Sequence, residues 1–136
     1  MSMDISNCTN LATLSTYKSN LVSLSLHNVD ALVELNIQSN PNLKHTGLGT
    51  SLHAIVNSEA EISLRSTHVM NLDEFVFRPL LEAFTSDESS SGYVDMEYVS
   101  LDCGCDVKWI IEDFLLQTKY FLHAKCLDGT ALADVS

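Results

Sequence analysis

The chain has 136 residues, 46% of them hydrophobic, which is enough for the core of one domain. Its 18 acidic residues outnumber 7 Lys and Arg, and the formal net charge is −11. This charge argues against binding to nucleic-acid phosphates or to an anionic membrane surface. The longest apolar stretch, Phe114 to Leu122, is too short and too polar to span a bilayer, so membrane insertion is not expected.

The opening residues, MSMDISNCTN, contain neither the basic segment nor the apolar run that begins a secretory signal. The expectation is therefore either a cytosolic protein or a mature fragment. Asn7 begins an N-x-T glycosylation pattern. Because this pattern is common by chance, and because burial of Cys8 would make its neighbour poorly accessible, Asn7 is a weak candidate for modification.

A leucine-rich frame, L-x-x-L-x-L-x-x-N, is complete in LVELNIQSN at residues 32–40. This copy and three partial copies have the following central residues: Ile5, Ile37, Leu64 and Met96. Their spacings of 32, 27 and 32 residues lie near the upper edge for leucine-rich repeats. The alternation within each copy predicts a short strand with two side chains in the core. We therefore expect about four parallel strands with these central residues stacked in one column.

The last position of the frame is where the chain leaves each strand. In the four copies it holds Cys8, Asn40, Thr67 and Val99. An Asn at this point can bond the backbone groups of the turn, and Cys and Thr are smaller substitutes. Val99 cannot do so, which makes the last copy atypical, as terminal repeats usually are. Cys8 in this column is expected to be a buried thiol.

Residues 72–84, LDEFVFRPLLEAF, predict a helix that returns the chain between two strands. Pro79 suits the first turn of that helix, and the core-facing side chains are expected to be Leu80, Leu81 and Phe84. The Ser-rich residues 85–92, TSDESSSG, predict a solvated loop.

Residues 21–32 are harder to place. Leu24 and Leu26 resemble another strand copy, but Ile37 follows Leu26 by only 11 residues, which is too few for a full coil. We interpret this segment as convex-side structure within the first coil.

The segment CGCDVKWI follows the last copy, and Cys126 comes 23 residues after Cys103. The order of residues in this region resembles the C-terminal cysteine cap of secreted leucine-rich-repeat proteins, at Cys103, Cys105, Asp106, Val107, Trp109, Cys126, Gly129 and Leu132. The resemblance extends over nearly the whole chain. It is strongest to the small arthropod type, which includes the non-catalytic subunit of a shrimp luciferase.

This resemblance implies leucine-rich repeats over residues 1–102 and a cysteine cap over residues 103–136. It implies a disulfide between Cys103 and Cys126, with Cys105 unpaired or joined to something outside this chain. The last coil of such a fold exposes an apolar end. A segment with helical spacing could cover it with Trp109, Ile110, Phe114, Leu115 and Phe121. Asp106 could cap the helix that carries Trp109.

The expected fold class is therefore α/β: a short right-handed leucine-rich-repeat solenoid with a parallel concave sheet of about four strands and a helical C-terminal cap. An alternative use of the cysteines is a zinc-stabilised domain, in which C-x-C, His123 and Cys126 form a Cys3His site. The C-x-C spacing is tighter than zinc sites usually show, so no metal is expected.

No catalytic residue and no cofactor are expected. Residues 47–51, GLGTS, are too short for a dinucleotide-binding loop and are interpreted as a turn. The five His residues are scattered, without a Cys or carboxylate partner at motif spacing. A small hydrolase with Cys8 or Cys105 beside a His is kept as an alternative from a different class.

The outward side chains of the four copies predict a polar concave face. In chain order they are Asp4, Ser6, Asn36, Gln38, Ser63, Arg65, Asp95 and Glu97. Leucine-rich-repeat proteins usually bind through this face, so by analogy we expect binding at Asn36, Gln38, Ser63, Arg65, Asp95 and Glu97. The expected function is a non-catalytic, extracellular protein-binding module, as a subunit of a complex or the C-terminal part of a longer chain. The alternative is a cytosolic adaptor or scaffold.

Overall fold

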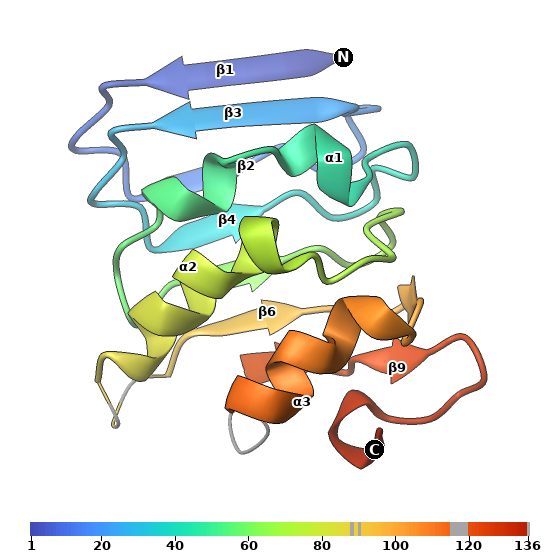
Figure 1. Cartoon of the computed structure of the whole chain (residues 1–136). Helices are drawn as coiled ribbons and strands as arrows, with labels where there is room; N and C mark the ends of the chain where they lie inside the picture. Colours follow the sequence, from blue (N-terminus) through green and yellow to red (C-terminus); the bar gives the residue numbers. More distant parts are fainter. Residues whose placement is uncertain (88, 90, 115–119, 136) are drawn as a thin grey trace.

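The computed structural model describes residues 1–87, 89, 91–114 and 120–135 (Figure 1). Its strands are β1 (Ser2–Ser6), β2 (Thr13–Ser15), β3 (Ser23–His27), β4 (Glu34–Asn36), β5 (Glu61–Ser63), β6 (Tyr93–Asp95), β7 (Ser100–Leu101), β8 (Phe121–Leu122) and β9 (Lys125–Cys126). Its α-helices are α1 (His45–Leu48), α2 (Glu74–Thr85) and α3 (Lys108–Phe114). Short 3-10 turns are η1 (Ser51–Ala54), η2 (Cys105–Val107) and η4 (Leu132–Asp134).

The main sheet is parallel and has five strands, in the order β2-β4-β5-β6-β8. Neighbouring strands in this sheet follow one another along the chain, and Figure 1 shows α1, α2 and α3 in front of it. Two smaller parallel pairs, β1-β3 and β7-β9, lie at the two ends of the molecule. The fold is therefore mixed α/β with a parallel sheet, and that sheet has one strand more than the four expected.

The strand register confirms three of the four predicted central residues. Leu35, Ile62 and Val94 pair across β4, β5 and β6, so Ile37, Leu64 and Met96 follow at equivalent positions. The prediction for Ile5 is wrong, because β1 pairs with β3 and sets Ile5 opposite Leu26.

The strand before β4 in the main sheet is β2, whose Leu14 pairs with Leu35. The leucine-rich frame does not reveal β2 because Thr16 stands where the next three copies carry a larger apolar residue. Thr16 is nevertheless buried, at 4% exposure. The apolar pattern of Met3 and Ile5 is stronger, but it serves the smaller β1-β3 sheet.

The segment 21–32 contains strand β3, which agrees with its interpretation as convex-side structure. β3 lies on the side of the helices, in the turn of chain that leads into β4 (Figure 1). Its second edge meets a side chain: Ser51 Oγ accepts a hydrogen bond from Leu26 N at 3.1 Å and donates one to Leu24 O at 2.5 Å. A buried hydroxyl thus satisfies backbone groups that another strand would otherwise pair.

Asn40 confirms the turn role predicted from the frame. Its side chain is fully buried; Oδ1 accepts from the backbone N–H groups of Ser19 and Leu21 at 3.1 and 2.8 Å. Nδ2 donates to the carbonyl oxygens of Thr16 and Ile37, both at 2.8 Å, and to a third at 3.2 Å. The amide therefore connects the turn after β4 to the turn after β2.

Thr67 repeats this role on a smaller scale, since its hydroxyl donates to Leu64 O at 2.7 Å. Cys8 does not, and the prediction of a buried thiol is wrong. Because β1 lies outside the main sheet, Cys8 is exposed and its Sγ donates to Ser6 O at 3.6 Å.

The turns after β2, β4, β5 and β6 each carry one non-glycine residue in the left-handed region, four positions after the paired residues Leu14, Leu35, Ile62 and Val94. The φ values lie between 53° and 65° at Lys18, Ser39, Ser66 and Tyr98. Left-handed backbone is unusual for such residues, so its recurrence marks the same turn built four times.

Helix α2 has the buried face that the sequence predicts, with Leu80, Leu81 and Phe84 fully buried. The predicted place of Pro79 is wrong, because α2 begins at Glu74, capped by Asp73, and Pro79 lies inside it. A proline there leaves the carbonyl of the residue four positions earlier, Phe75, without its helical donor. That oxygen instead contacts His53 Nε2 at 2.6 Å, so a neighbouring turn replaces the missing hydrogen bond.

The C-terminal end carries the disulfide that the family resemblance implied. Cys103 and Cys126 are bonded, with Cα atoms 5.5 Å apart, and Cys105 is an exposed free thiol. Trp109 is 7% exposed and its Nε1 donates to Leu72 O at 2.8 Å. Asp106 lies in η2 and accepts a hydrogen bond from Asn71, so it does not cap α3 as predicted.

Two further predictions for the cap have different outcomes. Phe121 is buried, but it lies in β8 and not in a helix. Leu115 falls outside the described residues.

Buried apolar side chains from Leu21 to Leu132 form one contiguous core. None of the helices in the described part of the chain has the length and apolar character needed to cross a membrane.

Candidate binding face on the parallel sheet

The outer side of the main sheet carries all six predicted binding residues. Leu35, Ile62 and Val94 point into the core with at most 1% exposure, so the residues on either side of each point outward. We call this surface the open face: Glu34, Asn36, Gln38, Glu61, Ser63, Arg65, Tyr93, Asp95 and Glu97. Asp4 and Ser6, also expected here, lie instead on β1 in the other sheet.

The strand register arranges the open face in rows. One row runs Glu34–Glu61–Tyr93, and the next runs Asn36–Ser63–Asp95. Adjacent strands are about 4.8 Å apart, so neighbours within a row are in contact range. Spacing along the chain does not show these rows, because their members are about 30 residues apart and each belongs to a different strand.

Arg65 is held by acidic neighbours. Its Nη2 lies 2.9 Å from Glu97 Oε2 and its Nε lies 3.7 Å from Asp95 Oδ2. The guanidinium carbon also stands 5.6 Å from the centre of the Tyr98 ring, which is within range of a cation–π contact. Since the Arg65 side chain is 36% exposed, these pairs add about 1 kcal/mol of stability at most. Their main consequence is a fixed arrangement of charge.

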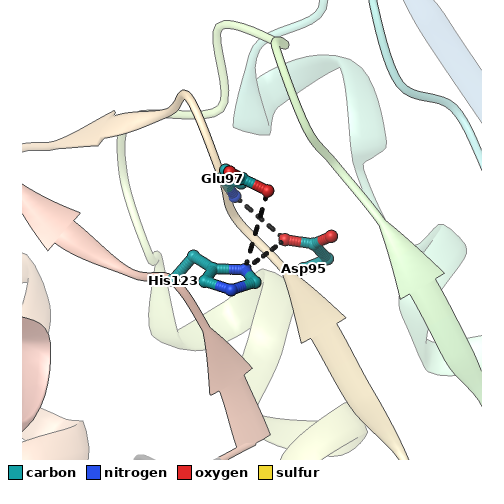
Figure 2. Close-up of side chains that lie close together, drawn as sticks. All are labelled: Asp95, Glu97 and His123. Atoms are coloured by element: carbon teal, nitrogen blue, oxygen red, sulfur yellow. Dashed lines mark hydrogen bonds and ion pairs between the residues drawn. The ribbon is translucent and has the colours of Figure 1, made fainter.

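His123 joins this network and was missed as a member of the face. Its Nδ1 lies 3.1 Å from Asp95 Oδ1 and 3.9 Å from Glu97 Oε2 (Figure 2). Phe121 was expected in a cap segment with helical spacing, so β8 was not anticipated. The pair Phe121–Leu122, buried then exposed just before His123, is the signal of a strand copy that could have revealed it.

Asp95, Glu97 and His123 are also the set that could hold a metal ion. One potential ligand atom from each lies within 4.8 Å of the others, and carboxylate and imidazole groups are common zinc ligands. However, Asp95 and Glu97 already pair with Arg65, and Asp95 Oδ1 accepts from Glu97 N at 3.1 Å. A cation would have to displace a guanidinium, so the geometry is better explained as an internal ion-pair network.

The Cys3His zinc alternative is wrong. Cys103 and Cys126 are joined in the disulfide, and His123 contacts Asp95. The hydrolytic alternative gains no support at Cys8, whose thiol contacts a backbone carbonyl. Asn7 is exposed, and its Oδ1 accepts from Asn28 Nδ2 at 2.7 Å. Glycosylation of Asn7 stays a prediction.

A hollow of about 200 Å³ lies within the open face, over β4, β5 and β6. The side chains that line it include the carboxylates of Glu34, Glu61 and Asp95, the guanidinium of Arg65, the phenol ring of Tyr93 and the hydroxyl of Ser63. Burial raises the pKa of the Tyr93 phenol above its usual value, and the charges of Glu61, Asp95 and Glu34 raise it further. The lining holds three carboxylates and one guanidinium, so its formal charge is negative.

Comparison with known proteins adds no assignment: no family matches, and no curated protein and no solved structure matches this chain.

Proposed function

We propose that this chain is a non-catalytic protein-binding module of the leucine-rich-repeat type, a short right-handed solenoid that recognises another protein through its open face. A secreted, extracellular protein is the favoured setting. The arthropod cap resemblance, the chain-order pairing of the strands and the recurring left-handed turn residues support the repeat architecture. Regular parallel strands joined by equivalent turns are what stacked repeats produce.

The observation that carries the binding proposal is the open face itself. Its polar side chains stand on strands above a fully buried core, and three of its charged side chains, Arg65, Asp95 and Glu97, are held by mutual contacts. Side chains ordered before a partner arrives lose less entropy on binding. Arg65, fixed between Glu97, Asp95 and the Tyr98 ring, belongs to the residue types enriched at binding hot spots.

The oxidation state of the cysteines indicates whether the protein is extracellular or cytosolic. A disulfide between Cys103 and Cys126 is compatible with an oxidising, extracellular setting. The exposed free thiols of Cys8 and Cys105 are the observation that favours the cytosolic adaptor alternative. Thiol alkylation of the native protein, followed by mass spectrometry, separates the two: a bonded Cys103–Cys126 pair supports secretion, and four alkylated cysteines contradict it.

The binding proposal is tested by using the disulfide-bonded chain as bait in its native secretion and identifying the retained protein by mass spectrometry. Titration calorimetry with that purified partner then compares the variants Arg65→Ala and Gln38→Ala. Each is expected to weaken binding by tenfold or more. Lys44→Ala, a change at an exposed cation next to α1, is the matched control and should leave affinity unchanged. Equal affinity in all three variants would place the binding surface elsewhere.

A further inference from the structure

The hollow in the open face contains a charge arrangement that the free protein does not compensate. Glu34 and Glu61 are directly opposite each other on β4 and β5, and both are exposed. Like charges at such a cross-strand position destabilise a sheet. In the described part of the chain neither carboxylate takes part in an ion pair. Arg65 also lines the hollow, but its guanidinium pairs with Asp95 and Glu97.

Hydrogen-bonding capacity is also unused at this place. Ser63 Oγ lines the hollow, has less than 1 Å² of exposed surface and has no hydrogen-bond partner. A buried hydroxyl without a partner is uncommon in folded proteins. It lies one row from the Glu34–Glu61 pair, on the same outer surface of the sheet. Two anionic acceptors in the hollow thus stand next to a buried hydroxyl that has no partner among the described residues.

Tyr93 is the aromatic residue of the lining. It is the next residue in the row after Glu61, and its ring is partly buried at the edge of the hollow. An aromatic face beside carboxylates suits a planar cation, which can stack on the ring while its N–H groups point to the oxygens. An ammonium group is a compact point charge and uses this arrangement less fully.

We infer that the part of the hollow lined by Glu34, Glu61, Ser63 and Tyr93, beside the ion pairs of Arg65, is a binding site for an arginine side chain of the partner protein. The guanidinium donates to the two carboxylates and stacks on the Tyr93 ring, and it relieves the repulsion between Glu34 and Glu61. This inference rests on the proposed binding through the open face and names the chemistry of the partner. The partner presents a basic segment, which also suits a chain with a net charge of −11.

The test uses the whole disulfide-bonded chain and the blocked peptide Gly-Gly-Arg-Gly-Gly at low salt. Peptide is titrated into ¹⁵N-labelled protein, and amide shifts are followed by NMR. We expect saturable shifts at Asn36, Glu61 and Ser63. A peptide with citrulline, which has the shape of arginine without its charge, should give none, and a lysine peptide should bind at least threefold more weakly than the arginine peptide.

The double variant Glu34→Gln and Glu61→Gln should weaken arginine-peptide binding at least tenfold, with an unfolding temperature no lower than wild type because the repulsion is gone. Glu59→Gln is the matched control: Glu59 is an exposed glutamate two positions before Glu61 that does not line the hollow. Should the double variant not fold, Glu34→Gln alone and the citrulline comparison keep the test decisive.

Equal binding of the citrulline peptide, unchanged affinity in the double variant, or shifts located outside the hollow would each overturn the inference. So would equal affinity for lysine and arginine peptides. If the peptide fails while Arg65→Ala still weakens the native partner, only the assignment of the hollow falls and open-face binding stands. If Arg65→Ala leaves the affinity for the native partner unchanged but the peptide occupies the hollow, the assignment of the hollow stands and open-face binding of that partner falls.

Discussion

The two ends of the main sheet are covered very differently. Beyond β6, five side chains are buried with at most 7% exposure: Trp109, Tyr120, Phe121, Cys126 and Leu132. The disulfide between Cys103 and Cys126 links two segments of this region. At the other end, within the described residues, β2 pairs only with β4 and β1 only with β3. The apolar side chains there are only partly buried: Met3, Ile5, Leu11 and Leu14.

This comparison shows that the alternation of apolar and polar residues does not decide burial by itself. Ile5 and Ile62 both stand inside short alternating strands, yet Ile62 is 1% exposed and Ile5 is only partly buried. The difference is the second neighbour, because Ile62 has a strand on each side and Ile5 has one. Segments with fewer buried contacts open more readily, so the described structure should be least stable near β1.

The largest expected effect is at the covered end. Cys126→Ser removes the bond to Cys103 and should lower the free energy of unfolding by about 2–5 kcal/mol under oxidising conditions. Urea denaturation measures this. Cys105→Ser, at an exposed free thiol, is the control and should change stability by less than about 0.5 kcal/mol. A small effect of Cys126→Ser would show that α3 and β9 hold this end without the bond.

A matched pair of truncations compares the two ends directly. Ile62→Ala should destabilise by about 3 kcal/mol, because it leaves a cavity in a closed core. Ile5→Ala should destabilise by about 1 kcal/mol, because part of that side chain already contacts water. Chemical denaturation of both variants gives the comparison. Equal losses would mean that the β1 end is as well packed in solution as the centre of the sheet.

Asn40 tests how the less covered end is attached to the rest. Asn40→Ala should lower the free energy of unfolding by about 2 kcal/mol, because backbone groups of Ser19, Leu21 and Thr16 lose buried partners. Faster hydrogen exchange at the Leu21 amide should accompany the loss. Asn42→Ala, at an exposed amide two residues later, is the control and should change stability by less than about 0.5 kcal/mol. A neutral Asn40→Ala would show that water replaces the side chain.

The smallest expected effect concerns pH. Because the pKa of Tyr93 is raised in the folded protein, its contribution to stability is complete below the ordinary phenol pKa of about 10 and is lost as the pH rises through the folded value. As the pH rises from about 9 to 11, the free energy of unfolding of Tyr93→Phe should therefore fall less than that of the wild type. Unfolding curves at several pH values measure the slopes. Identical slopes for the two proteins would contradict the raised pKa.

Much of the local structure could be predicted from the sequence. The frame at residues 32–40 located β4 and assigned Asn40 to its turn, and the spacing of Leu80, Leu81 and Phe84 identified the buried face of α2. These features depend on side chains a few residues apart, so the chain itself contains the signal. The six residues expected on the outward face were also found together, since alternation decides which side chains point outward.

Which strands become neighbours was decided only by the tertiary structure. The first 15 residues contain two strand candidates, and the stronger apolar pattern, at Met3 and Ile5, pairs with β3 while Leu14 joins the main sheet. The pairing depends on contacts between residues about 20 positions apart, which local periodicity does not encode. For the same reason the sequence alone did not bring His123 to Asp95 or set Glu34 against Glu61. The types of side chain could be recognised along the chain, but the distances between them that make a site exist only after the strands have paired.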